Sequence, residues 1–344
     1  SMHKKAFGID LGTSFSSIAT FQRDNFKIYS DKFGNSLISS VVIYSKNFVN
    51  VGEHNCEDIE SPELKIDNSK LLLGSRYNKK KCRSFAFKTE KSEAGDDIII
   101  DLKSLGIKLH PYEVSKEILK YLVQVGNSHF DSKKQVKNVV IAIPGYFTEM
   151  QRQEIIKAAN GASLQIMKLV SEPAAVGIAY QYDKKGGNHK ILVFDFGGKS
   201  VNVSLLLVEN GIYNLEAVES DDHLGGNDFD QLIIDTLIKN NDLQKYTTDH
   251  QFMATFRKKV IEAKILLSKK ETATIFVPLD YYRRGAFVYD LSLKEFETIN
   301  KSLVDHIIEP VKRILDKKCL KPTDIDDILL SGGSSNMKFV SEKL

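Results

Sequence analysis

Two stretches of the sequence place an aspartate, glycine and hydroxyl groups between apolar runs. In the first, apolar residues lead to Asp10, Gly12 follows two positions later, and Thr13 and Ser14 complete the tip before alternation resumes. This pattern predicts two strands joined by a tight turn. Amide and hydroxyl groups at such a turn donate to phosphate oxygens, and Asp10 suits the hydration shell of Mg2+. Taken by itself, the stretch is equally explained as a hairpin closed by an Asx turn.

A second stretch, in the other half of the chain, repeats the plan. Asp195 ends an apolar run, Gly197 and Gly198 follow, and Ser200 precedes a strand-like alternation. Asp195 lies 185 positions after Asp10 (195 − 10), about half of the chain length. Self-similarity at this spacing predicts two lobes of one design. Two such hairpins facing each other across a cleft would hold one polyphosphate from both sides.

Length and composition indicate an ordinary globular protein with two domains. The 344 residues give room for two domains, and 42% hydrophobic with 27% charged residues are typical of a folded chain. The net charge of +3 (48 basic minus 45 acidic residues) is too balanced to favour nucleic acid as a partner. We therefore expect no direct contact with nucleic acid. Separately, we expect this part of the protein to be a monomer.

Cysteine usage and apolar runs bear on the cellular compartment. Cys56, Cys82 and Cys319 are odd in number and far apart, so they predict neither a disulfide framework nor a zinc site. No apolar run reaches the roughly 18 residues that a membrane span needs. The first strand begins too close to the N-terminus for a signal peptide. These observations predict a cytoplasmic protein without a membrane contact.

Apolar periodicity predicts the elements that position the two tips. Residues 5–50 alternate in the manner of a small antiparallel sheet, and 139–144 is an apolar run typical of a buried parallel strand. Thr148 is a suitable cap for the next helix, and Gly161 is its stop. Other elements are predicted as follows: helices over 111–126, 224–240, 250–269 and 293–317, the last kinked at Pro310, and strands over 164–170, 272–279, 286–289 and 325–330.

The boundary between the lobes is predicted at Lys184–Asn188, where two glycines follow two lysines and the second hairpin starts directly afterwards. Lobe I is then 1–187 and lobe II is 188–344. Near the end of lobe II, a third strand runs into small residues that include Gly332 and Gly333.

Seven motifs, in order along the chain, carry a resemblance to a known family. They are IDLGTSFS (9–16), GSRY (74–77), AIPGYF (142–147), SEPAAVGIAY (171–180), FDFGGKS (194–200), LGGNDFD (224–230) and LLSGGSS (329–335). Their order and spacing resemble the nucleotide-binding domain of the seventy-kilodalton heat-shock chaperones, the DnaK type. The resemblance implies an α/β, actin-like ATPase fold: two similar lobes with mixed sheets, flanked by helices, around a central nucleotide cleft. The stretch Ile191–Phe229 is more similar to the atypical, ribosome-associated, Ssz-like branch than to housekeeping members.

The resemblance also implies roles for single residues. Lys70 would neutralise charge on the γ-phosphate of ATP, and Glu172 would place the metal waters or the attacking water. Asp10 and Asp195 would hold Mg2+ through its waters, and Asp195 and Thr13 would take part in catalysis. By themselves, Lys70 fits a helix-surface lysine and Glu172 a first-turn carboxylate favoured by the helix dipole. The other contacts to ATP or ADP would come from Gly12, Thr13 and Ser14 in lobe I and from Gly197, Gly198, Ser200, Gly225, Gly226, Lys264, Ser268, Gly332 and Gly333 in lobe II.

The second phosphate loop departs from the family's pattern. The family has three consecutive glycines followed by Thr, Phe and Asp. Here Lys199 takes the place of the third glycine, Ser200 that of the threonine, and Asn202 that of the aspartate. Lys199 would crowd the loop or add positive charge near the phosphates, and Asn202 removes a carboxylate that would support the metal.

The adenosine side departs further. Ile261, Lys264, Ile265 and Ser268 share one helix face at i, i+3, i+4 and i+7, where the family has Glu, Lys, Arg and Ser. Asn336 stands where the family has a second arginine against the base. Loss of two cation–π contacts, at about 0.5–2 kcal/mol each, predicts weak ATP binding. The two isoleucines would either pack on the adenine or belong to the core.

Three functions are compatible with these residues. The first is a slow, Mg2+-dependent ATPase that drives a chaperone cycle with a J-domain co-chaperone and a nucleotide-exchange factor. The second is a degenerate member that binds nucleotide weakly or not at all and acts as a scaffold for a J-domain partner near the ribosome. A small-molecule kinase on the same fold is disfavoured, because no extra substrate domain is found. The family's peptide-binding domain is expected to be absent from these 344 residues.

Overall fold

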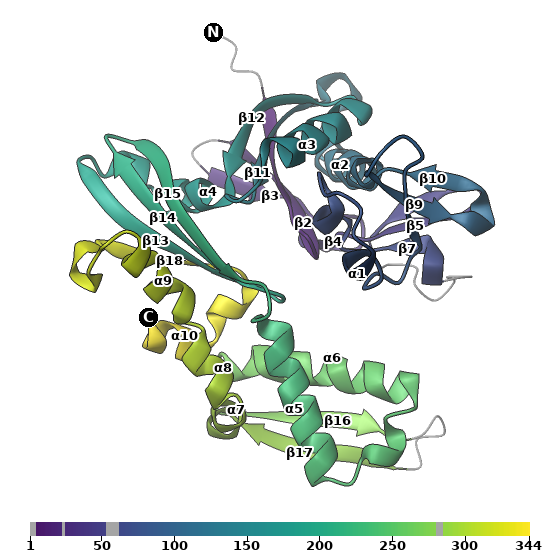
Figure 1. Ribbon diagram of the computed structural model, residues 1–344, viewed down its shortest axis with the longest axis vertical. Helices are drawn as coiled ribbons and strands as arrows, with labels where there is room; N and C mark the ends of the chain where they lie inside the picture. The colour runs from purple at the N-terminus through teal and green to yellow at the C-terminus, as the bar shows by residue number, and fades with distance from the viewer. Residues whose placement is uncertain (1–4, 23–24, 53–61, 280–284) are drawn as a thin grey trace. The chain divides into compact units, whose positions relative to one another are not determined.

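The computed structural model consists of two compact units, Ser1–Glu172 and Pro173–Leu344 (Figure 1). The division lies 15 residues before the boundary predicted at 187 (187 − 172). Residues 173–187 go with the second unit because Val176 and Tyr182 pack against strands of that unit. Cys56 lies outside the residues that the structure describes. The described residues are 5–22, 25–52, 62–279 and 285–344.

The first unit holds a six-stranded sheet, two smaller sheets and three helices among its described residues. In chain order its elements are β1 (Ala6–Leu11), β2 (Phe15–Gln22), β3 (Asn25–Ile28), β4 (Ile38–Ser39), β5 (Val42–Tyr44), β6 (Val49–Val51), β7 (Lys65–Ile66), α1 (Lys79–Cys82), β8 (Thr89–Lys91), β9 (Ile98–Leu102), β10 (Ile107–Leu109), α2 (Pro111–Asn127), β11 (Asn138–Ile143), α3 (Glu149–Gly161) and β12 (Gln165–Ser171).

The large sheet has the order β12-β11-β1-β2-β3, with β4 beside β2. β11 pairs in parallel with β1 and with β12, which confirms the buried parallel strand predicted over 139–144. The prediction of one antiparallel sheet over 5–50 is wrong, since β1 also pairs in parallel with β11 and β5 belongs to the separate sheet β6-β5-β7. A local alternation pattern specifies the face of a strand but not its partner.

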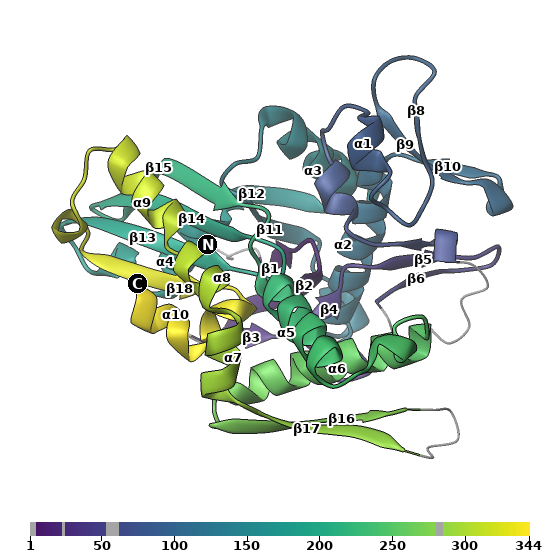
Figure 2. The same ribbon diagram turned by 60° about the horizontal axis from the view of Figure 1, so that its bottom comes forward.

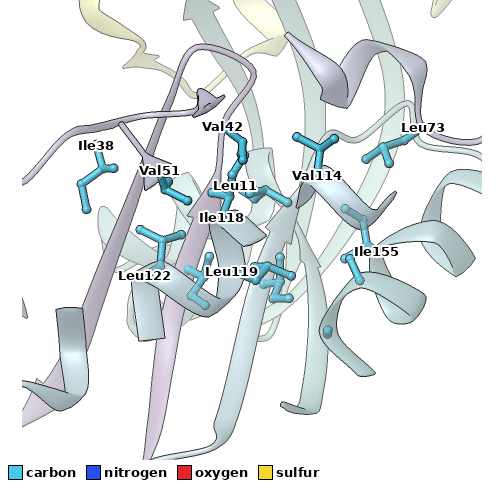
Figure 3. Packing of buried hydrophobic residues seen from close by; sticks show 14 of the residues in the cluster. Leu11, Ile38, Val42, Val51, Leu73, Val114, Ile118, Leu119, Leu122 and Ile155 are labelled. Atoms are coloured by element: carbon cyan, nitrogen blue, oxygen red, sulfur yellow. The ribbon is translucent and has the colours of Figure 1, made fainter. Parts of the chain in front are cut away.

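Helix α2 forms the centre of the first unit's core. Pro111 occupies its first turn, where no amide hydrogen is needed. Val114, Ile118 and Leu122, spaced by four, are at most 2% exposed and lie against Leu11 and the β5–β6 strands (Figure 3). Helix α3, which packs beside α2, starts at the predicted cap: the Thr148 hydroxyl accepts from the Gln151 amide (3.3 Å).

The second unit consists of a four-stranded sheet, a two-stranded hairpin and seven helices among its described residues. Figure 2 shows the hairpin lying along α6. No helix in the described part of the chain is long and apolar enough to cross a membrane. The elements are α4 (Glu172–Ala179), which begins at the junction, β13 (Asn188–Phe196), β14 (Val201–Glu209), β15 (Ile212–Asp221), α5 (Gly226–Asn240), α6 (His250–Leu267), β16 (Thr272–Pro278), β17 (Ala286–Ser292), α7 (Leu293–Ile299), α8 (Lys301–His306), α9 (Glu309–Lys317), β18 (Asp327–Ser331) and α10 (Lys338–Lys343).

Both units use the same strand plan around their aspartates. β1 and β2 form one antiparallel hairpin, and β13 and β14 form the other. In each unit, the first strand of the hairpin also pairs in parallel with a strand from much later in the chain. Asp10 is thus opposite Ala142 of β11, and Asp195 is opposite Ser331 of β18. The repeat predicted from the two tips is present in the structure.

The single helix predicted over 293–317 is wrong. Three helices, α7, α8 and α9, occupy this segment, with interruptions at Asn300 and at 307–308. Asn300 is fully buried, and its side-chain amide donates to the Phe296 carbonyl (3.1 Å), an alternative to regular helix bonding. Pro310 lies in the first turn of α9, so it starts a helix here instead of kinking one.

Candidate functional site

The first predicted tip, between β1 and β2, is a crowded turn. A Cβ atom on Gly12 would lie 1.9 Å from the carbonyl oxygen of Phe15, so only glycine fits. The Ser40 hydroxyl donates to the Gly12 carbonyl (2.8 Å), and the Ser40 amide donates to the Ser14 carbonyl (2.8 Å). Thr13 is half-buried and Ser14 is exposed, so both predicted phosphate-binding hydroxyls remain at the surface.

Ser40 is a residue that the sequence prediction missed. It is 3% exposed, and its hydroxyl also lies 2.7 Å from that of Ser16. Its signal in the sequence is weak, because a serine before an apolar run is common at the start of a strand. The structure assigns it a clear positioning role: it ties the tip to the chain that enters β5.

Lys70 and Glu172 meet beside this tip. Lys70 lies in a 3-10 turn, Ser69–Leu72, and its ammonium donates to the Leu11 carbonyl (2.5 Å). The same ammonium is 3.3 Å from a Glu172 carboxylate oxygen and 5.7 Å from the centroid of the Phe147 ring. Lys70 is only 9% exposed, which excludes its interpretation as a helix-surface lysine. Glu172 is the first residue of α4, so it combines the first-turn position with this ion pair.

Asp10 belongs to the same group of charges. Partial desolvation by the surrounding protein and the negative charge of Glu172 raise the pKa of Asp10 to about 6, against the opposing effect of Lys70. The residue keeps solvent-accessible surface, so a hydrated ion or a water molecule can reach it. The surroundings thus disfavour the charged form of Asp10, while its side chain stays open to solvent. Such a carboxylate is well suited to a cation, because a nearby positive charge offsets the unfavourable effect of Glu172 and of desolvation.

The second predicted tip, between β13 and β14, rests on the start of α5. The Gly197 amide donates to the Ser200 carbonyl (3.0 Å) and closes the turn. The carbonyls of Gly197 and Gly198 accept from the first two amides of α5 (3.0 and 2.8 Å). Gly225 is the N-cap of that helix. These contacts explain why the LGGNDFD motif accompanies the tip, since its backbone supports the loop.

The third glycine turn follows β18 and packs on the same tip. Gly332 has a φ of 82°, and a Cβ atom there would lie 2.6 Å from a carboxylate oxygen of Asp195. The Ser334 hydroxyl donates to the Gly197 carbonyl (3.1 Å). Gly333 is exposed. The second unit therefore brings the predicted residues of FDFGGKS, LGGNDFD and LLSGGSS into one continuous structure.

Helix α6 carries the face predicted to contact adenosine. The Lys264 ammonium donates to the Gly226 carbonyl (3.1 Å) and to the Asp230 carboxylate (2.8 Å), which is 1% exposed. Burial raises the pKa of Asp230, and the Lys264 charge opposes that shift. The Ser268 hydroxyl donates to the Ile265 carbonyl (2.6 Å). Ile265 is 61% exposed, which excludes a core role for its side chain.

A comparison with models of known protein families identifies the family of this chain. The model of the Hsp70 protein family matches residues 6–344. The chain belongs to the Hsp70 family. Its two units with their matched hairpins have the α/β, actin-like ATPase fold that the seven motifs predicted. The matched region corresponds to the ATP-binding domain of this chaperone family.

The structure describes each residue that the resemblance led us to expect as a departure from the family's motifs. Lys199 is exposed at the second tip. Asn202 donates through its amide nitrogen to the Ser200 hydroxyl (3.0 Å), and within the described residues its buried carbonyl oxygen has no hydrogen-bond partner. Ile261 is half-buried on α6, and the exposed Asn336 donates to the Gly333 carbonyl (3.2 Å). With these residues in place, each tip still has its closing main-chain bond, from the Ser40 amide to the Ser14 carbonyl and from the Gly197 amide to the Ser200 carbonyl.

The donor groups fit a hydrated Mg2+ ion better than a directly bound metal. Across the described ranges, no three His, Cys, Asp or Glu side chains are placed to hold a metal ion directly. Mg2+ retains several waters and commonly binds through one or two carboxylates plus substrate phosphates. Within the first unit, Asp10 with its raised pKa is a carboxylate of this kind, and within the second unit Asp195 lies beside Gly332.

Proposed function

We propose that this Hsp70 domain binds ATP with Mg2+ through its two hairpin tips and hydrolyses it slowly. The observation that carries the proposal is the position of Lys70, buried between the Leu11 carbonyl and the Glu172 carboxylate and close to Asp10. An ammonium group held in this way stabilises charge on a transferred phosphoryl group without reorganising during the reaction.

The proposed reaction breaks the bond between the γ-phosphorus and its bridging oxygen as water attacks, and ADP and phosphate leave. Lys70 stabilises charge on the γ-phosphate. Glu172 orients the attacking water, and the Thr13 hydroxyl donates to a phosphate oxygen. Mg2+ would neutralise charge on the phosphate oxygens when bound, with Asp10 and Asp195 holding its waters.

Weak binding is expected on the adenosine side of the site. Ile265 offers apolar surface where the family has an arginine, and Asn336 offers a short amide in place of the second arginine. Lys264 is already engaged with Asp230, so any contact with the ribose competes with that pair. Lys199 adds one positive charge near the phosphates, which compensates for only part of these losses.

The same losses support a second candidate, a scaffold that does not hydrolyse ATP. The Hsp70 family generally works with J-domain and nucleotide-exchange co-chaperones. A domain that keeps the fold but has lost its contacts to the adenine base would still present a surface to a J-domain partner. If the domain belongs to the Ssz-like branch, this partner would act near the ribosome. In either function we infer a cytoplasmic domain that is monomeric by itself.

Calorimetric titration with Mg–ATP, followed by single-turnover hydrolysis, separates the two candidates. The proposed ATPase requires measurable binding and slow turnover that Lys70→Ala removes. Binding without turnover would support the scaffold. Turnover at an ordinary chaperone rate, abolished by Lys70→Ala, would exclude the scaffold, whereas the absence of any binding would contradict the proposed ATPase.

A further inference from the structure

The first unit carries a groove that shares no residue with the candidate nucleotide site. Its volume is about 710 Å³. Residues Glu117, Lys120, Tyr121 and Gln124 of α2 line it, and their spacing of i, i+3, i+4 and i+7 places them on one face of the helix. The other lining segments are the loop before β4, the β5–β6 hairpin and the start of β10.

The groove has apolar side chains that are unusually open to solvent. Phe33 and Phe48 are 51% and 52% exposed, and Val49 and Ile107 also keep more than a third of their surface accessible. Single exposed apolar residues are normal, whereas several around one concave surface indicate a binding site. Phe33 is held in position because the Phe33 amide donates to the Asp31 carboxylate (2.9 Å).

Among the described residues that line the groove, positive charge exceeds negative charge. Lys32, Lys46 and Lys120 line it, and within the described part of the chain none of their ammonium groups has a carboxylate at ion-pair distance. The acidic lining residue Glu117 already lies 3.4 Å from the ammonium of Lys116. The Lys32 ammonium lies 5.1 Å from the centroid of the Phe33 ring, so charge and apolar surface are adjacent here. Three lysines without a described carboxylate partner, beside apolar side chains, are complementary to a ligand that carries carboxylates and apolar groups.

The edge of a sheet also borders the groove. Among described residues, β6 pairs with β5 and with no other strand. The Gly52 amide donates to the Val41 carbonyl and the Ser45 amide donates to the Phe48 carbonyl, so Phe48 and Gly52 face β5. By alternation, Val49 and Val51 direct their main-chain groups to the open edge. An extended peptide can add to such an edge.

We propose that this groove binds an extended acidic peptide segment of a partner protein, with aromatic or aliphatic side chains between its carboxylates. The peptide backbone pairs with the β6 edge, its carboxylates meet Lys32, Lys46 and Lys120, and its apolar side chains pack on Phe33 and Phe48. This site requires neither bound ATP nor hydrolysis.

Fluorescence anisotropy tests the proposal with a fluorescein-labelled peptide that alternates Glu-Phe and Glu-Leu pairs. The triple variant Lys32→Glu, Lys46→Glu and Lys120→Glu should bind this peptide about tenfold more weakly or worse. The matched control, Lys80→Glu, Lys103→Glu and Lys133→Glu, changes three exposed lysines of the same unit that do not line the groove and should bind as the wild type does. Raising the salt from about 0.05 to about 0.5 M should weaken wild-type binding.

A second pair of variants tests the apolar contribution. Phe48→Ser should weaken the peptide about fivefold, whereas Phe276→Ser, which removes a similarly exposed ring from the second unit, should not. Equal affinity of the two lysine triples, or equal binding of a peptide with Lys in place of Glu, would overturn the proposal. Binding of a labelled oligonucleotide or of anionic vesicles through the same lysines, without binding of the acidic peptide, would overturn it as well.

Discussion

The ammonium of Lys70 lies 3.3 Å from a carboxylate oxygen of Glu172, although the two residues are 102 positions apart in the chain. If this pair serves hydrolysis, Lys70→Ala should slow single-turnover hydrolysis of ATP by about 100-fold or more, because the phosphoryl group loses its neutralising partner. ATP affinity should change much less. Lys80→Ala, at an exposed lysine of the same unit, is the control, and an unchanged rate in Lys70→Ala would contradict the assigned role.

Gly12→Ala tests the crowding at the first tip. The added methyl group would meet the Phe15 carbonyl at 1.9 Å, so the turn must open. We expect the free energy of unfolding, measured by urea titration, to fall by more than about 2 kcal/mol. Gly95→Ala has no atom within 4 Å of the new methyl group and should change stability by less than about 0.5 kcal/mol. Equal effects of the two substitutions would refute the steric explanation.

The raised pKa of Asp10 gives the first unit a defined pH dependence. Between the ordinary value of 3.8 and about 6, the folded chain binds more protons at this group than the unfolded chain. The contribution of Asp10 to the free energy of unfolding therefore decreases as pH rises through this range and stays unfavourable above it.

Asp10→Asn should accordingly be more stable than the wild type near pH 7. Its free energy of unfolding should also decrease less than that of the wild type as the pH rises to this value. Urea titrations at about pH 5 and about pH 7 measure the difference. Glu93→Gln, at an exposed carboxylate of the same unit, serves as the control. A variant less stable than the wild type near neutrality would show that the carboxylate is favoured in the folded state after all.

Substitutions in the Lys264–Asp230 ion pair test its contribution to the stability of the second unit. Lys264→Met removes the cation that pairs with the Asp230 carboxylate, and Asp230 is only 1% exposed. The substitution should therefore lower the free energy of unfolding by about 3 kcal/mol. The double variant Lys264→Met and Asp230→Leu should recover most of this loss. Lys259→Met breaks an exposed pair with Glu262 and should cost less than about 1 kcal/mol. Additive losses in the double variant would mean that the pair is not coupled.

Ile265→Arg tests whether an arginine at this position of α6, which the resemblance implies for the family, raises ATP affinity. The new guanidinium would be on the solvent-exposed side of α6, at the position where the resemblance implies a contact with the base. Calorimetry should show Mg–ATP binding about fivefold tighter, as expected for one cation–π contact. Ile212→Arg places the same charge at another exposed isoleucine of the unit and controls for general electrostatic attraction. Equal gains from both variants would argue against a specific contact.

The local features of this protein follow from short stretches of its amino-acid sequence. The two Asp-x-Gly tips, the buried strand β11 and the Thr148 cap of α3 were all predicted, because each depends on residues within a few positions of one another. The family could also be identified in this way, since seven local motifs in a fixed order are difficult to obtain by chance.

Contacts between groups that are distant in the chain could not be predicted in this way and are seen only in the folded protein. The burial of Lys70 against Glu172, the bonds of Ser40 to the first tip and the pKa of Asp10 depend on residues that are remote in the chain. The interruption at Asn300 coincides with the full burial of that side chain, which no local pattern reveals. Burial, desolvation and ion pairing are properties of the packed chain, so they arise only once the elements that local sequence specifies have come together.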